Sequence, residues 1–488
     1  MAGSADGTRA RFDGGGKLAD VPPSPASEEL ARAALEWLEA TAVADGDGVW
    51  WSGKPSSAEP DPTLYHGTAG IALALLEADA HFGGGRWGEL AVRGTRWLAA
   101  AVDTWDSASY PALYFGTAGT ALALHEAAGR LGDAGARADR DDAEAWRAAA
   151  MRGLAGVRAA FDGERWGDAY ELMFGNAGIG LAALRLGDAE LAEAAVTPYL
   201  RTAETTAFGL TWEQRRGQPA RRHHISHGTL GIAYALAAVG TAVGRRDLVD
   251  AALAGVADVV ARNEAGPAGF LVPHSDPQQV AFGLERYSYG WCHGPAGDAQ
   301  VFRLLEQLAD SAPGPGGGSG IADGSGAGQA GSPDGAGGGD GWRALVDRCW
   351  QTVTTSGLPE RLRPGFWDNS GRCCGTGGVL ALACDREVEN GDGLAFADLL
   401  VADLGRRATV DAAGARWSNV EHRASPPELE PRPGWAMGNA GLVRELLRHA
   451  RITTGRDPSY AVQWPDQPAT TRIAAGRAAA PEMTSSEG

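Results

Sequence analysis

The chain has no long hydrophobic run and little positive charge. No stretch of about 18 apolar residues occurs in its 488 residues, and the N-terminal segment has no apolar core of a signal peptide. We therefore expect no transmembrane helix and a cytoplasmic protein. The formal net charge of -18 disfavours binding to nucleic acids and to anionic membranes.

Cysteine is also scarce, and strand patterns are missing. The chain has five cysteines, an odd number, at positions 292, 349, 373, 374 and 384. In a cytoplasmic chain, clustered cysteines bind a metal more often than they form disulfides. No segment shows the strict alternation of apolar and polar residues that is typical of strands. These absences leave a soluble, helical protein with a candidate metal site.

One short motif occurs seven times, as Gly-x-x-Gly followed by an apolar run. The first glycines of the seven copies are 49, 59, 53, 66, 81 and 63 residues apart, at Gly67, Gly116, Gly175, Gly228, Gly294, Gly375 and Gly438. A period of this size indicates one supersecondary unit that repeats around a ring or along a solenoid.

The segments between the glycine motifs predict two kinds of helix. The run after each motif, such as residues 71–82, is apolar nearly all round and predicts a buried helix. The segments before the motifs, such as residues 88–105, are amphipathic at helical spacing. We therefore predict an all-α fold, an α/α toroid of seven helical hairpins with the glycine motifs at one end. An open helical solenoid is the alternative.

Composition divides the chain into one domain and three low-complexity segments. Residues 1–26 and 466–488 are expected to be disordered, and residues 27–465 are expected to form the toroid. Residues 311–341 are a run of Gly, Ser and Pro that cannot bury enough apolar surface to fold. Without these 31 residues the longest repeat shrinks to 50, so we interpret them as a disordered insertion.

Three cysteines lie at corresponding places of adjacent units. Cys292 precedes the fifth glycine motif, and Cys373 and Cys374 directly precede the sixth. Three thiolates at the ends of neighbouring inner helices suit Zn²⁺, which prefers sulfur and tolerates three protein ligands with an open fourth position. The alternative is that they are small residues packed beside glycines. Cys349 and Cys384 lie in apolar helical sequence and are expected in the core.

Four other residues are candidates for chemistry near these cysteines, namely His227, His293, Glu171 and Arg286. His227 precedes the fourth motif, in the place that His66, His293 and Cys374 occupy in theirs, and histidine suits acid/base work near neutral pH. Glu171 is four residues before Gly175 and either orients a histidine or the substrate, or caps a helix. Arg286 either stabilises an enolate or is an ordinary surface arginine. His223 and His224 lie in an arginine-rich loop and are expected to be solvated.

The seven motifs, with Trp-Cys-His-Gly at 291–294 and Cys-Cys-Gly at 373–375, resemble the lanthionine synthetase C-like family. The resemblance covers roughly residues 27–460. It implies an α/α toroid with a zinc ion at one end of the central cavity. The zinc ligands of the family fall on Cys292, Cys373 and Cys374, as in the cyclase domains of certain fused lanthipeptide synthetases.

The resemblance also assigns roles to single residues. It places the proposed acid/base histidine of the family on His227, and an aromatic or histidine position beside the first zinc cysteine on His293. The family often has Asp where this chain has Glu171, which resembles the glutathione-binding branch. Its arginine stands nearer to the fifth-unit cysteine than Arg286 does.

The activity implied is zinc-dependent addition of a peptide cysteine thiolate to dehydroalanine or dehydrobutyrine. The seven units account for all of the sequence that is expected to be ordered, and we expect no dehydratase or kinase module in it. If the chain makes lanthionine, we expect a separate dehydratase to supply the dehydrated precursor peptide. Two alternatives remain open at this point. The chain either adds glutathione to dehydroamino acids, as the eukaryotic relatives suggest, or is a non-catalytic zinc scaffold.

Overall fold

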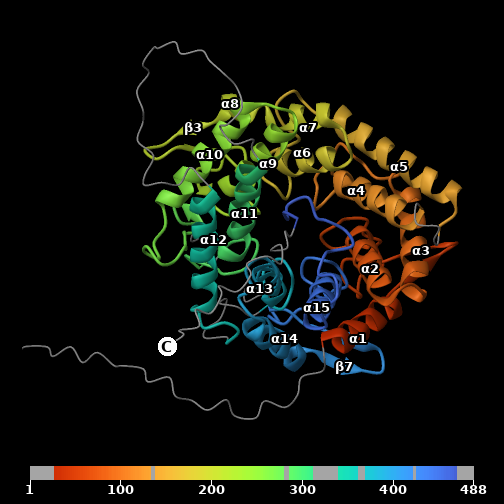
Figure 1. The fold of residues 1–488 in the computed structure, drawn as a ribbon. Coiled ribbons are helices and arrows are strands. Elements are labelled where there is room, and N and C mark those ends of the chain that lie inside the picture. Colours follow the sequence, from red (N-terminus) through yellow and green to blue (C-terminus); the bar gives the residue numbers. More distant parts are fainter. Residues whose placement is uncertain are drawn as a thin grey trace, which may run out of the picture.

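The computed structural model describes residues 27–132, 138–279, 285–311, 339–360, 369–420 and 425–469. In this part of the chain the helices form two concentric rings, and the sequence runs once around them (Figure 1). The predicted α/α toroid is therefore confirmed. The inner ring consists of α2 (Thr68–Phe82), α4 (Thr117–Ala127), α6 (Asn176–Arg185), α9 (Thr229–Ala242), α11 (Pro295–Ser311), α13 (Thr376–Asn390) and α15 (Asn439–Thr453).

Each inner helix packs against an outer helix that is amphipathic. Two short elements lie outside this pairing. The π-helical turn η1 (Ala128–Gly132) extends α4, and the short helix α8 (Tyr199–Thr202) follows the outer helix α7 (Ala189–Val196). The outer helices are α1 (Ser27–Ala40), α3 (Arg86–Ala101), α5 (Arg140–Ala159), α7 (Ala189–Val196), α10 (Arg246–Ala261), α12 (Gly339–Thr354) and α14 (Ala395–Arg407). The inner helices are buried on nearly all sides because they face both the outer ring and their two neighbours.

The inner ring is closed. Each inner helix contacts the next one along the chain, from α2 to α15, and α15 packs against both α2 and α1. These last contacts join the two ends of the described chain and rule out the open solenoid. A closed ring leaves no terminal repeat with an exposed apolar face.

Four short antiparallel strand pairs accompany the helices in the described residues, where the sequence predicted no strand. Each strand has only two or three residues, too few to show an alternating pattern. The pairs are β1 (Val43–Asp45) with β2 (Gly48–Trp50), β3 (Glu204–Thr205) with β4 (Leu210–Thr211), β5 (Arg221–Arg222) with β6 (Ser275–Asp276), and β7 (Thr409–Asp411) with β8 (Gly414–Arg416).

Each glycine motif is a tight wrap of the chain around the start of an inner helix. The helix begins directly after the first glycine in all seven motifs. In six of them an N–H of the first helical turn donates to the carbonyl seven residues earlier, as Thr117 N does to Tyr110 O at 2.8 Å. A Cβ at the first glycine, Gly116, would overlap that same carbonyl. The wrap thus satisfies helix N–H groups and requires glycine.

A belt of backbone hydrogen bonds links the motifs around the ring. The residue two positions before the first glycine donates its N–H to the carbonyl of the same residue in the next motif. Six such bonds form: Tyr65 to Tyr114 (2.9 Å), Tyr114 to Met173 (3.4 Å), Ser226 to Cys292 (3.4 Å), Cys292 to Cys373 (3.1 Å), Cys373 to Ala436 (2.8 Å) and Ala436 to Tyr65 (3.0 Å). At the remaining step Met173 N donates to the Glu171 carboxylate instead, at 2.6 Å.

The segment after α15 turns back into the middle of the ring (Figure 1). Trp464 stacks on Trp435 with ring centroids 4.4 Å apart, and it also contacts Tyr114. Asp466 and Gln467 are buried, and Arg444 on α15 donates to Gln467 at 3.1 Å. The ordered chain therefore continues past the boundary predicted at residue 465, because this aromatic segment fills the lumen.

The predicted disordered segments lie mainly outside the described residues. This holds for residues 1–26, for most of 311–341 and for 470–488. Of the insertion, Ser311 ends α11 and Gly339 begins α12. Among the described helices, none has the length and hydrophobicity needed to cross a membrane.

The wrap predicts a large difference between two glycines of the α4 segment. Gly119→Ala should lower the stability by at least about 2 kcal/mol, because the new methyl would overlap Leu113 O and the Leu64 side chain. Gly129, in the turn η1, is exposed and has open space around it, so Gly129→Ala should change stability by less than about 1 kcal/mol. Thermal unfolding of both variants measures this, and equal melting temperatures would contradict the wrap.

Candidate functional site

The residue before the first glycine of each motif lies at one pole of the toroid. Ring contacts connect consecutive members: His66 to Phe115 (5.5 Å between centroids), Phe115 to Phe174 (4.3 Å), Phe174 to His227 (6.0 Å) and His227 to His293 (5.4 Å). Cys374 and Met437 hold the same position in the last two motifs. The pole therefore carries an arc of aromatic and imidazole rings that ends next to the cysteines.

Three cysteines meet at this pole, as the sequence predicted. The Sγ atoms of Cys292 and Cys374 are 3.1 Å apart, and those of Cys374 and Cys373 are 3.4 Å apart. All three sulfurs lie within 4.8 Å of one another. The belt bond from Cys292 N to Cys373 O at 3.1 Å holds the two loops together. This group, the cysteine trio, is the one cluster in the described residues whose geometry could hold a metal ion.

The surroundings of the trio favour one thiolate. The thiols of Cys292 and Cys374 hydrogen-bond to Cys373 and hold the pKa of Cys373 well below its usual range. Tyr65 supports this charge through its hydroxyl, 3.5 Å from Cys373 Sγ. Cys374 directly precedes Gly375, the N-cap of α13, and the inner helices all begin at this pole. Their N-terminal partial charges stabilise anionic sulfur.

The donor set fits a metal that prefers sulfur. The three sulfur atoms lie within 4.8 Å of one another. Cys292 and Cys373 are buried, and Cys374 is partly exposed. Zinc in this kind of site takes three protein ligands and leaves one position open. The other two cysteines are remote from the trio, on α12 and inside α13, and both are buried as expected. Burial raises the pKa of Cys384 to about 12.

His227 and Glu171 form a pair beside the trio. Glu171 Oε2 lies 3.3 Å from His227 Nδ1, and it accepts the Met173 N–H at 2.6 Å. The Glu171 side chain is 1% exposed and that of His227 is 20% exposed. The rings of Phe174 and His293 lie on the two sides of the His227 ring. The carboxylate is thus fixed by the backbone of the third motif. It lies at ion-pair distance from Nδ1 of a partly accessible imidazole, without a hydrogen bond between them.

The expectation that His223 and His224 are solvated is wrong. Both are buried, because β5 pairs with β6 and draws the arginine-rich loop inward. His224 Nδ1 lies 2.8 Å from Asp298 Oδ2 on α11, and its ring meets those of His274 and His293 edge-on. Burial lowers the pKa of His223 to about 3, so this imidazole is neutral at physiological pH.

A sequence signal for the buried histidines existed. His224 stands four residues before Gly228, the offset at which Glu171 stands before Gly175. His274 had no such signal, because it reaches the site through the β5–β6 pairing alone. Burial lowers its pKa to about 3 as well.

Arg286 is not brought to the trio. Its guanidinium is half exposed and forms an ion pair with Glu264, and Tyr287 also contacts this carboxylate. The arginine that the fold places among the histidines is Arg222. The pKa of His274 is lowered mainly by burial, then by the charge of His224, and then by the charge of Arg222. Arg222 is partly buried and donates to Gln279 at 3.2 Å.

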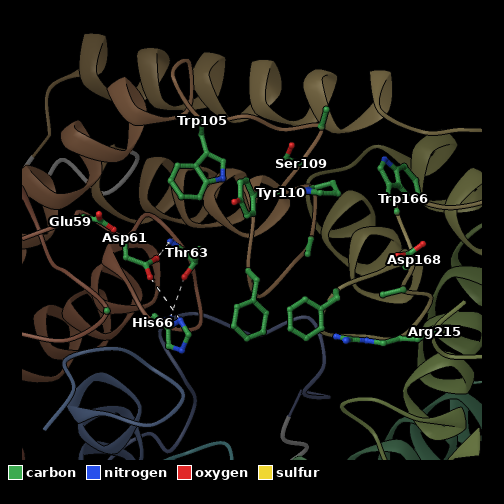
Figure 2. Close-up of a pocket in the computed structure, with 18 of the residues that line it drawn as sticks. Glu59, Asp61, Thr63, His66, Trp105, Ser109, Tyr110, Trp166, Asp168 and Arg215 are labelled. Atoms are coloured by element: carbon green, nitrogen blue, oxygen red, sulfur yellow. Dashed lines mark hydrogen bonds and ion pairs between the residues drawn. The ribbon is translucent and has the colours of Figure 1, made fainter. Parts of the chain in front are cut away.

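A cavity of about 870 Å³ opens at the same pole. His66 (Figure 2), Phe115 and Phe174 line it. These three residues belong to the arc that leads to His227. Tyr65, whose hydroxyl contacts Cys373, stacks on Phe115 at 4.4 Å. The cavity and the trio therefore belong to one continuous face.

Comparison with known proteins agrees with the fold. Residues 59–305 match the profile of a family described as lanthionine synthetase C-like protein. A solved structure of nisin cyclase is 14% identical with a TM-score of 0.54, over 88% of this chain and 94% of that chain. The Lin0763 protein from Listeria innocua is 13% identical with a TM-score of 0.43, over 88% and 99%. No curated protein matches the sequence.

The environments of the cysteines predict different reactivities in metal-stripped protein. Iodoacetamide at neutral pH should modify the trio first, at the partly exposed Cys374 or the low-pKa Cys373. Cys349 and Cys384 should stay unmodified, because burial raises the pKa of both thiols. Peptide mapping by mass spectrometry measures this, with fully denatured protein as the control in which all cysteines react. Early modification of Cys349 or Cys384 would contradict the assignment.

Proposed function

This chain belongs to the lanthionine synthetase C-like family, and on that premise we propose that it is a zinc-dependent cyclase forming thioethers in peptides. The reaction is addition of a cysteine thiolate to the β-carbon of dehydroalanine or dehydrobutyrine. The observation that carries the proposal is the position of the cysteine trio next to the His227–Glu171 pair, with sulfurs within 4.8 Å and a carboxylate 3.3 Å from the imidazole.

Cys292, Cys373 and Cys374 would hold the zinc ion. When bound there, zinc supplies a Lewis acid that lowers the pKa of a substrate thiol, so that the thiolate forms at neutral pH. The chain contributes the negative charge of its thiolates, with helix N-termini of the inner ring around them. The partly exposed Cys374 marks the side from which a substrate reaches the site.

His227 is the proton carrier in this proposal. When the sulfur bonds to the β-carbon, the π electrons of the C=C bond move to an enolate. The α-carbon of the enolate then needs one proton. His227 accepts the proton that the thiol releases and returns it to the α-carbon, so that S–H adds across the double bond with no net redox change. The Glu171 carboxylate lies 3.3 Å from Nδ1 and attracts the protonated imidazole. Because Nδ1 is buried, we assign the proton transfer to Nε2.

His293 and Glu171 are positioning residues here. The His293 ring stacks against His227 at 5.4 Å with an interplanar angle of 27°, and so limits its rotation. Arg286 takes no role in the proposal, because its guanidinium is bound to Glu264 at the surface.

A second candidate is addition of glutathione to dehydroamino acids. The observation that favours it is Glu171, since the segment Glu-Leu-Met-Phe-Gly at 171–175 resembles the glutathione-binding branch. Zinc ligands and proton carrier would be the same, and only the thiol donor would differ. A zinc scaffold without activity is the third outcome that the tests below distinguish.

The metal assignment predicts about one zinc ion per chain in purified protein. Cys373→Ala and Cys374→Ala should each lose the ion, because two remaining thiolates hold it weakly. Cys349→Ala and Cys384→Ala should keep it, since these thiols lie outside the trio. Elemental analysis of the folded proteins measures the stoichiometry. Comparable zinc loss from all four variants would refute the ligand set.

The catalytic assignment predicts that His227→Ala slows thiol addition about 10²–10⁴-fold while zinc stays bound. The control is His125→Ala, which removes a histidine near the far end of α4 and should leave the rate unchanged. Mass spectrometry follows loss of free thiol in a dehydrated peptide that carries its own cysteine, and in a cysteine-free peptide with added glutathione.

Faster ring closure than glutathione addition supports the cyclase, and the reverse supports the second candidate. If zinc-loaded protein accelerates neither reaction, the chain is a scaffold. If His227→Ala loses zinc as well as rate, the assignment of His227 as proton carrier is wrong.

A further inference from the structure

A stacked pair of phenylalanine rings forms the aromatic floor of the cavity at the pole. Phe115 and Phe174 stack with centroids 4.3 Å apart and planes 6° from parallel. His66 borders the floor at one end, and Arg215 borders it at the other (Figure 2). Because the two rings face each other, the floor presents their partly exposed edges. These edges favour an apolar side chain of a bound molecule, because apolar surface is removed from water on contact.

The two ends of the floor differ in charge balance. At the His66 end, Asp61 lies 3.9 Å from the imidazole, and Arg432 is close enough to lower the pKa of His66 together with burial. This end therefore carries both a carboxylate, Asp61, and a cation, Arg432. At the other end the guanidinium of Arg215 lies 5.0 Å from the centroid of Phe174. No described carboxylate forms an ion pair with Arg215, and its Nε is buried without a hydrogen-bond partner.

The adjacent arginine shows the contrast. Arg216 is more than half exposed and lies 4.0 Å from the carboxylate of Asp168. Arg215 instead points along the cavity floor (Figure 2). An arginine held against an aromatic ring without a counter-ion is suited to bind a carboxylate of a ligand by a charge-assisted hydrogen bond.

The backbone holds Arg215 in this place. Arg215 forms an antiparallel bridge with Ala169, and the neighbouring bonds are Tyr170 N to Gln214 O and Arg216 N to Asp168 O, both 2.9 Å. The partner segment leads directly into Glu171 and Phe174. The cation, the aromatic floor and the carboxylate that orients His227 are therefore parts of one fixed unit.

The spacing relates this cation to the reacting residue of a substrate. Phe174 lies 5.0 Å from the Arg215 guanidinium and 6.0 Å from the His227 ring, so Arg215 and His227 are at most about 11 Å apart. An extended peptide covers this distance in about three residues.

We propose that the cavity binds the part of the substrate peptide that flanks the reacting residue. An apolar side chain lies on Phe115 and Phe174, and the carboxylate of an Asp or Glu within about three residues of the reacting residue binds Arg215. That this peptide is a substrate rests on the proposed function. Its binding to the cavity can be measured without any reaction.

The test uses a pair of unreactive peptides. Each is an acetylated and amidated hexapeptide with Ala in place of the reacting residue, Phe beside it, and either Glu or Gln three residues away. The Glu side chain is then the only carboxylate. Isothermal titration calorimetry measures their affinities for the wild-type protein and for the Arg215→Ala, Arg215→Lys and Arg216→Ala variants, with a thermal melt to verify folding.

The wild-type protein and Arg216→Ala should bind the Glu peptide about tenfold more tightly than the Gln peptide. Arg215→Ala should bind both peptides with the affinity of the Gln peptide, and Arg215→Lys should keep part of the preference. Equal affinities in the wild-type protein, a preference that survives in Arg215→Ala, or no binding of either peptide would overturn the proposal. The peptides cannot react, so this test is independent of catalysis. If the protein prefers the Glu peptide but accelerates no thiol addition in the activity assay, the cyclase proposal is wrong and the binding proposal stands.

Discussion

The close wrap of each loop around the start of an inner helix is the constraint on which the rest of this toroid depends. A carbonyl seven residues upstream accepts an N–H of the first helical turn, and the glycine between them has no room for a side chain. This bond forms in six of the seven motifs, and all seven inner helices start at one pole. The belt bonds then connect neighbouring wraps, so that closing the ring satisfies backbone groups that would otherwise be buried without partners.

The same belt sets the geometry of the candidate site. Cys292 and Cys373 are consecutive members of the belt, and their backbone bond brings together sulfurs that are about eighty residues apart in sequence. The belt is interrupted where the Glu171 carboxylate takes the N–H of Met173. This interruption aims a buried carboxylate at His227. The cysteine trio therefore lies at regular steps of this repeated bond, and the His227–Glu171 pair lies at the irregular step.

Charge at the pole follows from its lining. Helix N-termini bring positive potential to the thiols, and the charge of the partly buried Arg222 acts on Glu171. His223 and His274 stay neutral because burial lowers their pKa values to about 3. The adjoining cavity adds an aromatic floor with the cation of Arg215 at its end. Outside the cysteine trio, the pole therefore favours anionic groups over cationic ones.

The sequence by itself determined the repeat, the helical fold and the cysteine trio. The repeat and the helices depend on contacts within about ten residues, such as that of Gly116 with Tyr110. The trio depends on equivalent positions in consecutive repeats, which become neighbours when the repeats form a ring. Only the tertiary structure decided what depends on partners far along the chain. His224 is buried because Asp298 on α11 receives it, Arg286 faces solvent because Glu264 binds it, and Trp464 and Asp466 are ordered because the lumen has room for them. Local spacing carries no information about such long-range partners, since their positions follow from how the ring closes.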